Sequence, residues 1–241
     1  LHTATLVHDD IIDNSDLRRG KTTVNVAWSN SHGVLIGDFI YSKAFMLMNE
    51  IGNFKVIDEL SSATNKIAEG ELMQLANKNN LNTSLQQLKK ISYYKTGRLF
   101  EASAKSAAML SGKSIPFIEN ISKAAKLIGI AFQVRDDLLD YGVSKGNIGK
   151  PEMQDILEDK ITYPLYFALK YSNKKDSSKI LKKLKNKDFS IEEVADFVSS
   201  SNAFNKCNSL IQNYNNEISK CINQISNKEI RDEMLNLSES L

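Results

Sequence analysis

Apolar residues recur every three or four positions along most of this chain, the spacing that places them on one face of an α-helix. Two polar stretches interrupt the pattern early, at residues 14–23 and 77–83. Between and after these breaks, the pattern predicts helices over residues 1–12, 33–51, 54–77, 85–110 and 116–141. Pro116 fits the start of the last of these, because a first-turn residue donates no intrahelical hydrogen bond. The first two thirds of the chain are therefore predicted to be helical.

The last third differs in composition but keeps a helical pattern. Residues 170–187 are rich in lysine and are interpreted as a solvated helix face. A stripe with spacings of three and four follows, formed by Phe204, Cys207, Ile211, Tyr214, Ile218, Cys221 and Ile225. It predicts an amphipathic helix packed on the other helices, with a partner-binding helix as the alternative. No repeat or linker divides the sequence, so a single domain over residues 1–241 is expected.

Composition narrows the class of protein. Three prolines and eleven glycines in 241 residues favour long helices over a sheet. A formal net charge of +2 gives no general attraction to nucleic acid or to a membrane, so neither is expected as a partner. The longest apolar runs fall far short of the ~20 residues that a bilayer requires, so no stable membrane insertion is expected. The two cysteines have no metal-binding spacing and fit a reducing compartment, which predicts a cytoplasmic location.

Two acidic clusters are the strongest chemical feature of the sequence. Asp9, Asp10 and Asp13 form DDIID, and Asp136, Asp137 and Asp140 form DDLLD. Residues three or four positions apart share a helix face, so each cluster projects its carboxylates from one patch. Like charges this close destabilise a helix unless a cation compensates them. Apolar helical sequence precedes both clusters, which favours a lined cavity over a pair of solvated acidic turns.

The two carboxylate patches fit a magnesium site. Mg²⁺ is usually held by one or two carboxylates together with the phosphate oxygens of a substrate. Two patches facing across a helical bundle would hold Mg²⁺ ions that bridge a diphosphate. The cations would stabilise the negative charge of a departing pyrophosphate.

Basic side chains near the clusters are candidates for binding the diphosphate. Arg18 and Arg19 follow the first cluster by one short loop, and a guanidinium binds phosphate oxygens bidentately. Lys95, followed by Thr96, lies inside an otherwise apolar helix, where the alternative is an ordinary surface lysine.

Three further residues carry weaker indications, and one histidine is set aside. Gln133 lies three residues before the second cluster and therefore shares its helix face. Lys150 follows a glycine in a loop, and Lys160 precedes a Thr and a Pro by a few residues. His8, beside the first cluster, is interpreted as packed or hydrogen-bonded rather than catalytic.

Taken together, these motifs resemble the trans-polyprenyl diphosphate synthases, and most closely the bacterial octaprenyl diphosphate synthase type. The strings that carry the resemblance are LHTATLVHDDIIDNSDLRRGKTT, GDFIYSKAF, IAEGELMQL, KTGRLFEA and GIAFQVRDDLLDYG. The likeness is dense up to about residue 169 and fades afterwards. It implies an isoprenoid synthase-type bundle of helices around a central cavity, and a homodimer.

The resemblance also implies a reaction and its residues. The enzyme would condense isopentenyl diphosphate with an allylic diphosphate, using Mg²⁺, into a long all-trans polyprenyl diphosphate of octaprenyl type for a quinone side chain. Asp9 and Asp13 would bind Mg²⁺ with Asp10 in support, and Asp136 would bind a second Mg²⁺ with Asp137 and Asp140. The allylic diphosphate would be held by Arg18, Lys95, Thr96, Gln133, Lys150 and Lys160. Isopentenyl diphosphate would be held by Arg19, and Lys95 counts among the catalytic residues.

Product length, in such enzymes, depends on residues just before the first cluster. Ala4 and Thr5 lie one helical turn before Asp9. Short-product members of the family carry aromatic side chains there, whereas both residues here are small. A growing chain could pass them, which predicts a long product.

The sequence departs from the family pattern in two places. The helices that carry a Gly-Lys-x-x-Arg element and a histidine for isopentenyl diphosphate do not precede the first cluster, and the chain opens at Leu1 inside a helical pattern. N-terminal helices are therefore expected to be missing. Where the family has Gly-Asp-Asp-Leu, this chain has Met153, Gln154, Asp155 and Ile156, so one acidic group of the outer metal shell is replaced.

Other functions stay open at this stage. A short-chain synthase making farnesyl or geranylgeranyl diphosphate differs only in product length. A terpene cyclase shares one acidic motif but usually has an Asn/Ser/Glu-type triad in place of the second, and lacks the Arg-Arg-Gly that follows the first. A non-catalytic regulatory subunit of a prenyltransferase keeps the fold without full chemistry, and the intact aspartates argue against it.

Overall fold

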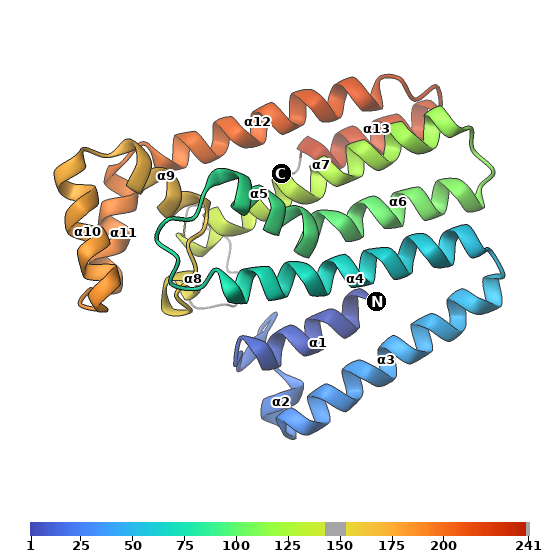
Figure 1. Cartoon of the computed structure of the whole chain (residues 1–241). Coiled ribbons are helices and arrows are strands. Elements are labelled where there is room, and N and C mark those ends of the chain that lie inside the picture. Colours follow the sequence, from blue (N-terminus) through green and yellow to red (C-terminus); the bar gives the residue numbers. More distant parts are fainter. Residues whose placement is uncertain (143–152, 240–241) are drawn as a thin grey trace. The chain divides into compact units, whose positions relative to one another are not determined.

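A computed structural model describes residues 1–142 and 153–239 (Figure 1). These residues are mostly helical, and the one sheet among them is a two-stranded hairpin, which confirms the predicted all-α class. They form two compact units, Leu1–Thr64 and the rest of the described chain from Asn65 onward. In the described part, no helix is long and apolar enough to cross a membrane. The expectation of a single domain stays a prediction.

The first unit carries the first acidic cluster. Its elements are α1 (His2–Ile12), β1 (Leu17–Arg18), β2 (Lys21–Thr22), α2 (Val24–Ala27), α3 (Asn30–Ile51) and the beginning of α4 (Phe54–Ala76). Helix α3 begins three residues before the predicted start, because the Ser29 hydroxyl accepts a hydrogen bond from the His32 N–H and caps the helix. It ends at Gly52, which has a left-handed backbone with φ of 68°.

Helix α1 packs closely on α3 at two glycines of α3. A Cβ atom on Gly37 would lie 2.1 Å from His8 Nε2, and one on Gly33 would lie 2.6 Å from Ile11 Cδ1. The two glycines are one turn apart, and so are the two residues that they receive. The face of α1 that carries His8 therefore packs on α3, at the end of α1 where the acidic cluster lies.

The stretch at residues 14–23, expected as a polar loop, contains a β-hairpin. Strands β1 and β2 pair antiparallel, with Leu17 opposite Thr22 and Arg18 opposite Lys21. The two residues between them are Arg19, with φ of 52°, and Gly20, with φ of 72°. Two consecutive positive φ angles are what a tight two-residue hairpin turn requires, and Gly20 adopts its angle without strain. The expectation of a plain loop was therefore wrong.

The second unit carries the second acidic cluster. After the end of α4 its elements are α5 (Leu85–Ser92), η1 (Tyr93–Gly97), α6 (Arg98–Leu110), α7 (Ile115–Asp140), α8 (Gln154–Leu157), α9 (Tyr163–Tyr171), α10 (Lys174–Asn186), α11 (Ile191–Ser200), α12 (Ala203–Ile222) and α13 (Lys228–Glu239). Figure 1 shows α6 and α12 running alongside α7, and both pack on it. Helix α7 is thus the centre of this unit.

The core of the second unit explains why α7 is so apolar before its aspartates. Ile128, Ala131, Val134 and Leu138 of α7 are all buried, and they belong to one cluster with buried residues of α9, α11 and α12. The predicted stripe in the last third supplies part of this cluster, since Cys207, Ile211, Tyr214, Ile218 and Cys221 of α12 are buried in it. Packing on the bundle is therefore confirmed for that stripe. The lysine-rich stretch forms α10, and most of its lysines are exposed, as expected.

One predicted helix, over residues 85–110, is divided by a π-helical turn. Helix α5 starts with a capping box between Ser84 and Gln87. The wider turn η1, of sequence YYKTG, then interrupts the α-helix before α6 begins. A π-turn adds one residue to the helical circumference and is frequent at functional sites. It contains Lys95 and Thr96, two of the candidate site residues.

Candidate active site

The three aspartates of the first cluster have different surroundings. Asp10 is buried, and Arg18 Nε donates a hydrogen bond of 2.6 Å to its Oδ1. Asp9 and Asp13 are half-buried and lie one turn apart at the end of α1, where the Asp13 N–H donates to the Asp9 carbonyl at 2.8 Å. The middle aspartate therefore holds the hairpin through Arg18, while the outer two have the spacing of a shared carboxylate patch.

The two arginines after the first cluster are separated by the hairpin geometry. Arg18 lies in β1 and turns back to Asp10, with only 24% of its side chain exposed. Arg19 lies at the exposed tip of the hairpin. Neighbours in sequence thus differ in role: one arginine is engaged by the acidic cluster, and the other projects where a ligand could reach it.

His8 is a packed residue, in agreement with its interpretation from the sequence. Its Nε2 lies 3.2 Å from the Val34 carbonyl oxygen and 3.4 Å from Asp38 Oδ1. Its ring stacks on Tyr41 of α3 with 5.8 Å between the ring centroids. Burial, and then the charge of Asp9, raise the pKa of the Tyr41 hydroxyl, so the acidic cluster also acts on α3.

The two residues expected to control product length lie on α1 as predicted from the sequence. Ala4 is completely buried. Thr5 is half-buried, and its hydroxyl donates to the His2 carbonyl oxygen at 2.7 Å. Their role in product length stays a prediction.

The second cluster, on α7, is also differentiated. Asp137 is buried and accepts hydrogen bonds from Gln133 Nε2 at 2.9 Å and from the Tyr163 N–H at 3.2 Å. Asp140 accepts from the backbone N–H groups of Gln154 and Asp155, at 2.9 and 3.2 Å. Asp136 is exposed. The cluster therefore has two carboxylates fixed by the protein and one that faces solvent.

Carboxyl groups lie close together around α8. Burial raises the pKa of Asp137 well above its usual range, and the charge of Asp155 raises it further. Burial and the charge of Asp140 raise the pKa of Asp155 to about 7. Gln154 replaces an acidic group of the family pattern, but the contact to Asp140 is made by the Gln154 backbone N–H, which any non-proline residue there supplies. The side-chain substitution leaves that contact intact.

The π-turn connects Thr96 to this cluster. Thr96 Oγ1 donates to Gln133 Oε1 at 2.7 Å, and Gln133 Nε2 donates to Asp137. The approach depends on two glycines, because a Cβ on Gly129 of α7 would lie 2.6 Å from the Gly97 Cα. The predicted shared face of Gln133 and the second cluster is thus confirmed, and Thr96 joins it from another helix.

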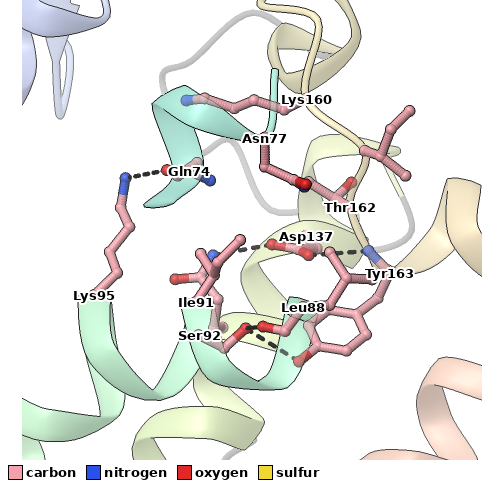
Figure 2. A pocket seen from close by; sticks show the side chains of 12 residues that line it. Gln74, Asn77, Leu88, Ile91, Ser92, Lys95, Asp137, Lys160, Thr162 and Tyr163 are labelled. Atoms are coloured by element: carbon pink, nitrogen blue, oxygen red, sulfur yellow. Dashed lines mark hydrogen bonds between the residues drawn. The ribbon is translucent and has the colours of Figure 1, made fainter. Parts of the chain in front are cut away.

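Lys95 and Lys160 line one pocket with Asp137, all within the second unit (Figure 2). Lys95 Nζ lies 2.7 Å from Glu71 Oε1 and 2.8 Å from Gln74 Oε1. Lys160 is buried and forms an ion pair with Glu158. Lys95 is therefore not the ordinary surface lysine of the alternative interpretation.

Two residues that contact Lys95 were not predicted from the sequence. Glu71 and Gln74 lie three residues apart on α4, inside the string IAEGELMQL, and Gln74 also lines the pocket. A polar pair at helical spacing directly after a glycine is the indication that could have drawn attention to them. Lys150 lies outside the described residues.

The residues present fit Mg²⁺, provided that the ion shares ligands with a substrate. Among the described residues, no group of three or more His, Cys, Asp or Glu side chains is arranged to hold a metal ion alone. The available donors are carboxylate oxygens, the type that Mg²⁺ prefers, and this ion commonly takes one or two of them plus phosphate oxygens and water. Burial and neighbouring carboxyl groups raise the pKa values of Asp137 and Asp155, so their ionised forms are disfavoured, and a bound cation would favour ionisation.

Comparison with known proteins agrees with this chemistry. The polyprenyl synthetase family matches residues 1–201. Octaprenyl diphosphate synthase of Escherichia coli (strain K12) is 42% identical over 180 residues, which cover 75% of this chain and 56% of that protein. The all-trans-nonaprenyl-diphosphate synthase (geranyl-diphosphate specific) of Rhodobacter capsulatus is 38% identical over 208 residues, covering 86% of this chain and 64% of the relative. The chain thus spans about half the length of the curated relatives it matches.

Solved structures give the same family. A polyprenyl synthase from Caulobacter crescentus CB15, complexed with calcium and isoprenyl diphosphate, superposes with a TM-score of 0.92 at 31% identity, covering 99% of this chain and 74% of that chain. A decaprenyl diphosphate synthase from Rhodobacter capsulatus gives a TM-score of 0.91 at 29% identity, with the same coverage. Because the family matches most of the sequence and the fold agrees over nearly all of it, the chain belongs to the polyprenyl synthetase family.

Proposed function

We propose that the protein is a Mg²⁺-dependent trans-prenyltransferase that condenses isopentenyl diphosphate with an allylic diphosphate into a long all-trans polyprenyl diphosphate. One observation carries the proposal: the hydrogen-bonded series from Thr96 through Gln133 to Asp137, beside Lys95 in one pocket. It combines a cation, neutral donors and carboxylates in the way that a metal-bound diphosphate requires. The relatives named for octaprenyl and nonaprenyl synthesis support a long product.

The protein's part in the reaction is to bind and orient two diphosphates. Asp9 and Asp13 on α1 and Asp136 on α7 would hold Mg²⁺, which when bound neutralises the diphosphate that leaves. Lys95, Thr96, Gln133 and Lys160 bind the allylic diphosphate, together with Lys150 and Arg18. Arg19, exposed at the hairpin tip, binds isopentenyl diphosphate.

The chemistry that this arrangement serves is an ionisation followed by an addition. The C–O bond between the allylic C1 and its diphosphate breaks, and the electron pair leaves with pyrophosphate. The double bond of isopentenyl diphosphate then attacks C1 and forms the new C–C bond. A proton is lost from the adduct to the released pyrophosphate, which restores a double bond and leaves a chain longer by one isoprene unit.

The proposal includes a homodimer, implied by the family resemblance, and a cytoplasmic location, predicted from the two cysteines. One face of α3 supports the dimer. Leu35, Phe39 and Met46 share this face and are 67%, 63% and 55% exposed. Several large apolar side chains exposed along one helix face favour a surface that another chain covers.

The reaction class is tested by label transfer. The chain is incubated with farnesyl diphosphate, labelled isopentenyl diphosphate and Mg²⁺, with and without a chelator. Transfer of label into an acid-labile prenyl diphosphate that the chelator abolishes supports the proposal. Hydrocarbon formed from farnesyl diphosphate alone would indicate a cyclase, and the absence of both products would indicate a non-catalytic subunit.

The metal assignment has a matched control. Asp9→Asn removes a proposed Mg²⁺ ligand, whereas Asp16→Asn removes an exposed aspartate of the loop that follows the cluster. The first variant is expected to lose nearly all label transfer and the second to keep it. Equal activity in the two variants contradicts the assignment.

A further inference from the structure

Lys95 is held by two residues for which the reaction has no direct use. Its ammonium lies 2.7 Å from the Glu71 carboxylate and 2.8 Å from the Gln74 amide oxygen. The side chains of Lys95 and Glu71 are only 20% and 14% exposed, so the ion pair is largely removed from water. Figure 2 shows Lys95 extending toward Gln74 at the rim of the pocket. Glu71 and Gln74 are three residues apart and reach the ammonium from one helix face.

The backbone explains how α4 comes so close to Lys95. A Cβ on Gly70 would lie 2.6 Å from the Lys95 backbone N and 2.9 Å from Tyr94 Cβ. Glycine at this position lets α4 touch the π-turn, and Glu71 is the next residue. On another side of the same turn, Gly97 meets Gly129 of α7. The π-turn is therefore fixed by close glycine contacts to both α4 and α7.

Counting donors indicates what the contact achieves. A lysine ammonium has three N–H groups, and Glu71 and Gln74 accept two of them. Among the described residues, no other group accepts from Lys95, and its side chain lines the pocket with Asp137 and Lys160. One N–H is thus left for a ligand in that pocket.

We infer that Glu71 and Gln74 are positioning residues, which orient Lys95 so that its third N–H meets an oxygen of the diphosphate. The inference rests on the proposed function, because it takes the pocket as the diphosphate site. A long flexible lysine loses rotamer freedom when it binds a ligand, and a side chain that is already ordered loses less. Glu71 also has an opposing effect, since its charge repels an anionic ligand.

Paired substitutions separate these two effects. Glu71→Gln removes the charge but keeps an acceptor for Lys95, whereas Glu71→Ala removes both. The measurement is the affinity for inorganic pyrophosphate with Mg²⁺, by isothermal titration calorimetry. We expect Glu71→Gln to bind at least as tightly as the native chain. We expect Glu71→Ala to bind about fivefold more weakly than Glu71→Gln, the effect of ordering one long side chain.

The same pair is repeated with Lys95→Met, where the difference between Gln and Ala at position 71 is expected to vanish. Gln74→Leu removes an acceptor for Lys95 without changing any charge. It should weaken binding relative to the native chain, as the loss of the acceptor does in Glu71→Ala. Glu69→Ala is the matched control, because Glu69 lies on the same helix but pairs with Lys66 at 2.6 Å, and its binding should equal that of the native chain.

The outcomes distinguish the inference from the function on which it rests. If Lys95→Met weakens binding while Glu71→Ala and Glu71→Gln bind alike, Lys95 is a ligand but the positioning role is wrong. If Lys95→Met leaves pyrophosphate binding unchanged, the assignment of the pocket to a diphosphate is wrong as well. Thermal unfolding of each variant shows whether a loss reflects the site or the fold.

Discussion

Thr96 Oγ1 donates a hydrogen bond to Gln133 Oε1 at 2.7 Å, and this contact determines which end of the Gln133 amide faces the second acidic cluster. With its oxygen facing Thr96, the amide presents Nε2 to Asp137 at 2.9 Å and to Asp136 at 3.4 Å. Thr96 thus orients the Gln133 amide, and the amide in turn donates hydrogen bonds to both aspartates. The hydroxyl comes from the π-turn and the amide from α7, so this hydrogen bond forms only when the two elements pack closely.

This relationship predicts a difference between two substitutions of Thr96. Thr96→Ser keeps the hydroxyl and should keep most of the activity. Thr96→Val removes the donor and lets the amide turn its oxygen toward the aspartates, which should lower kcat/KM about tenfold, the effect of roughly one hydrogen bond. Steady-state kinetics with the allylic substrate measures both. Equal kinetics in the two variants would mean that the orientation of the Gln133 amide has no bearing on the reaction.

The glycine contact between the π-turn and α7 predicts a packing effect. Gly129→Ala places a methyl group 2.6 Å from the Gly97 Cα, with backbone on both sides, so neither helix can yield cheaply. We expect a loss of about 1–3 kcal/mol in the free energy of unfolding, as for overpacked cores. Lys123→Ala, at an exposed position of the same helix, is the control and should change the stability little. Denaturant unfolding measures both, and an unchanged midpoint for Gly129→Ala would contradict the described contact.

The two arginines of the hairpin are predicted to respond in opposite ways. Arg18→Met leaves the buried Asp10 carboxylate without its 2.6 Å partner and should lower the stability by about 2 kcal/mol, less than for a fully buried pair because Arg18 is partly exposed. Arg19→Met should leave the melting temperature unchanged and raise the KM for isopentenyl diphosphate. The pair is tested by thermal unfolding together with kinetics. A stable Arg18→Met, or an Arg19→Met with native KM, would refute that half of the assignment.

The exposed face of α3 predicts the state of association. Phe39→Asp introduces a charge at the centre of the proposed dimer surface and should give a monomer at concentrations where the native chain is a dimer. Sedimentation velocity measures the mass of each. Lys55→Asp, an exposed position at the start of α4, makes a charge change away from this face and should leave the dimer intact. A native chain that sediments as a monomer would contradict the dimer itself.

Much of the second unit could be predicted from local pattern. The apolar spacing of α7 and the position of Gln133 three residues before Asp136 are properties of one helix, so periodicity alone placed them on a common face. The stripe of α12 was recognised for the same reason. The spacing of apolar residues indicates which face of a helix is buried, and this spacing can be read from one sequence alone.

Contacts between helices could not be predicted in the same way. The π-turn has the sequence YYKTG, which does not by itself predict a wider turn. The turn packs closely against Gly70 and Gly129, which are distant from it in the sequence. The ion pair of Glu71 with Lys95 likewise depends on the approach of α4. The hairpin was missed because its turn places Arg19 at a φ of 52°, a conformation that non-glycine residues adopt rarely.

The most direct test of the account is the length of the product. The chain is incubated with farnesyl diphosphate, an excess of labelled isopentenyl diphosphate and Mg²⁺, and the products are dephosphorylated and sized by reversed-phase chromatography. The account predicts a series of labelled prenols that ends well beyond geranylgeraniol and disappears with a chelator. A single short prenol would contradict the long product and the role of Ala4 and Thr5. No labelled prenol at all would contradict prenyl transfer by this chain.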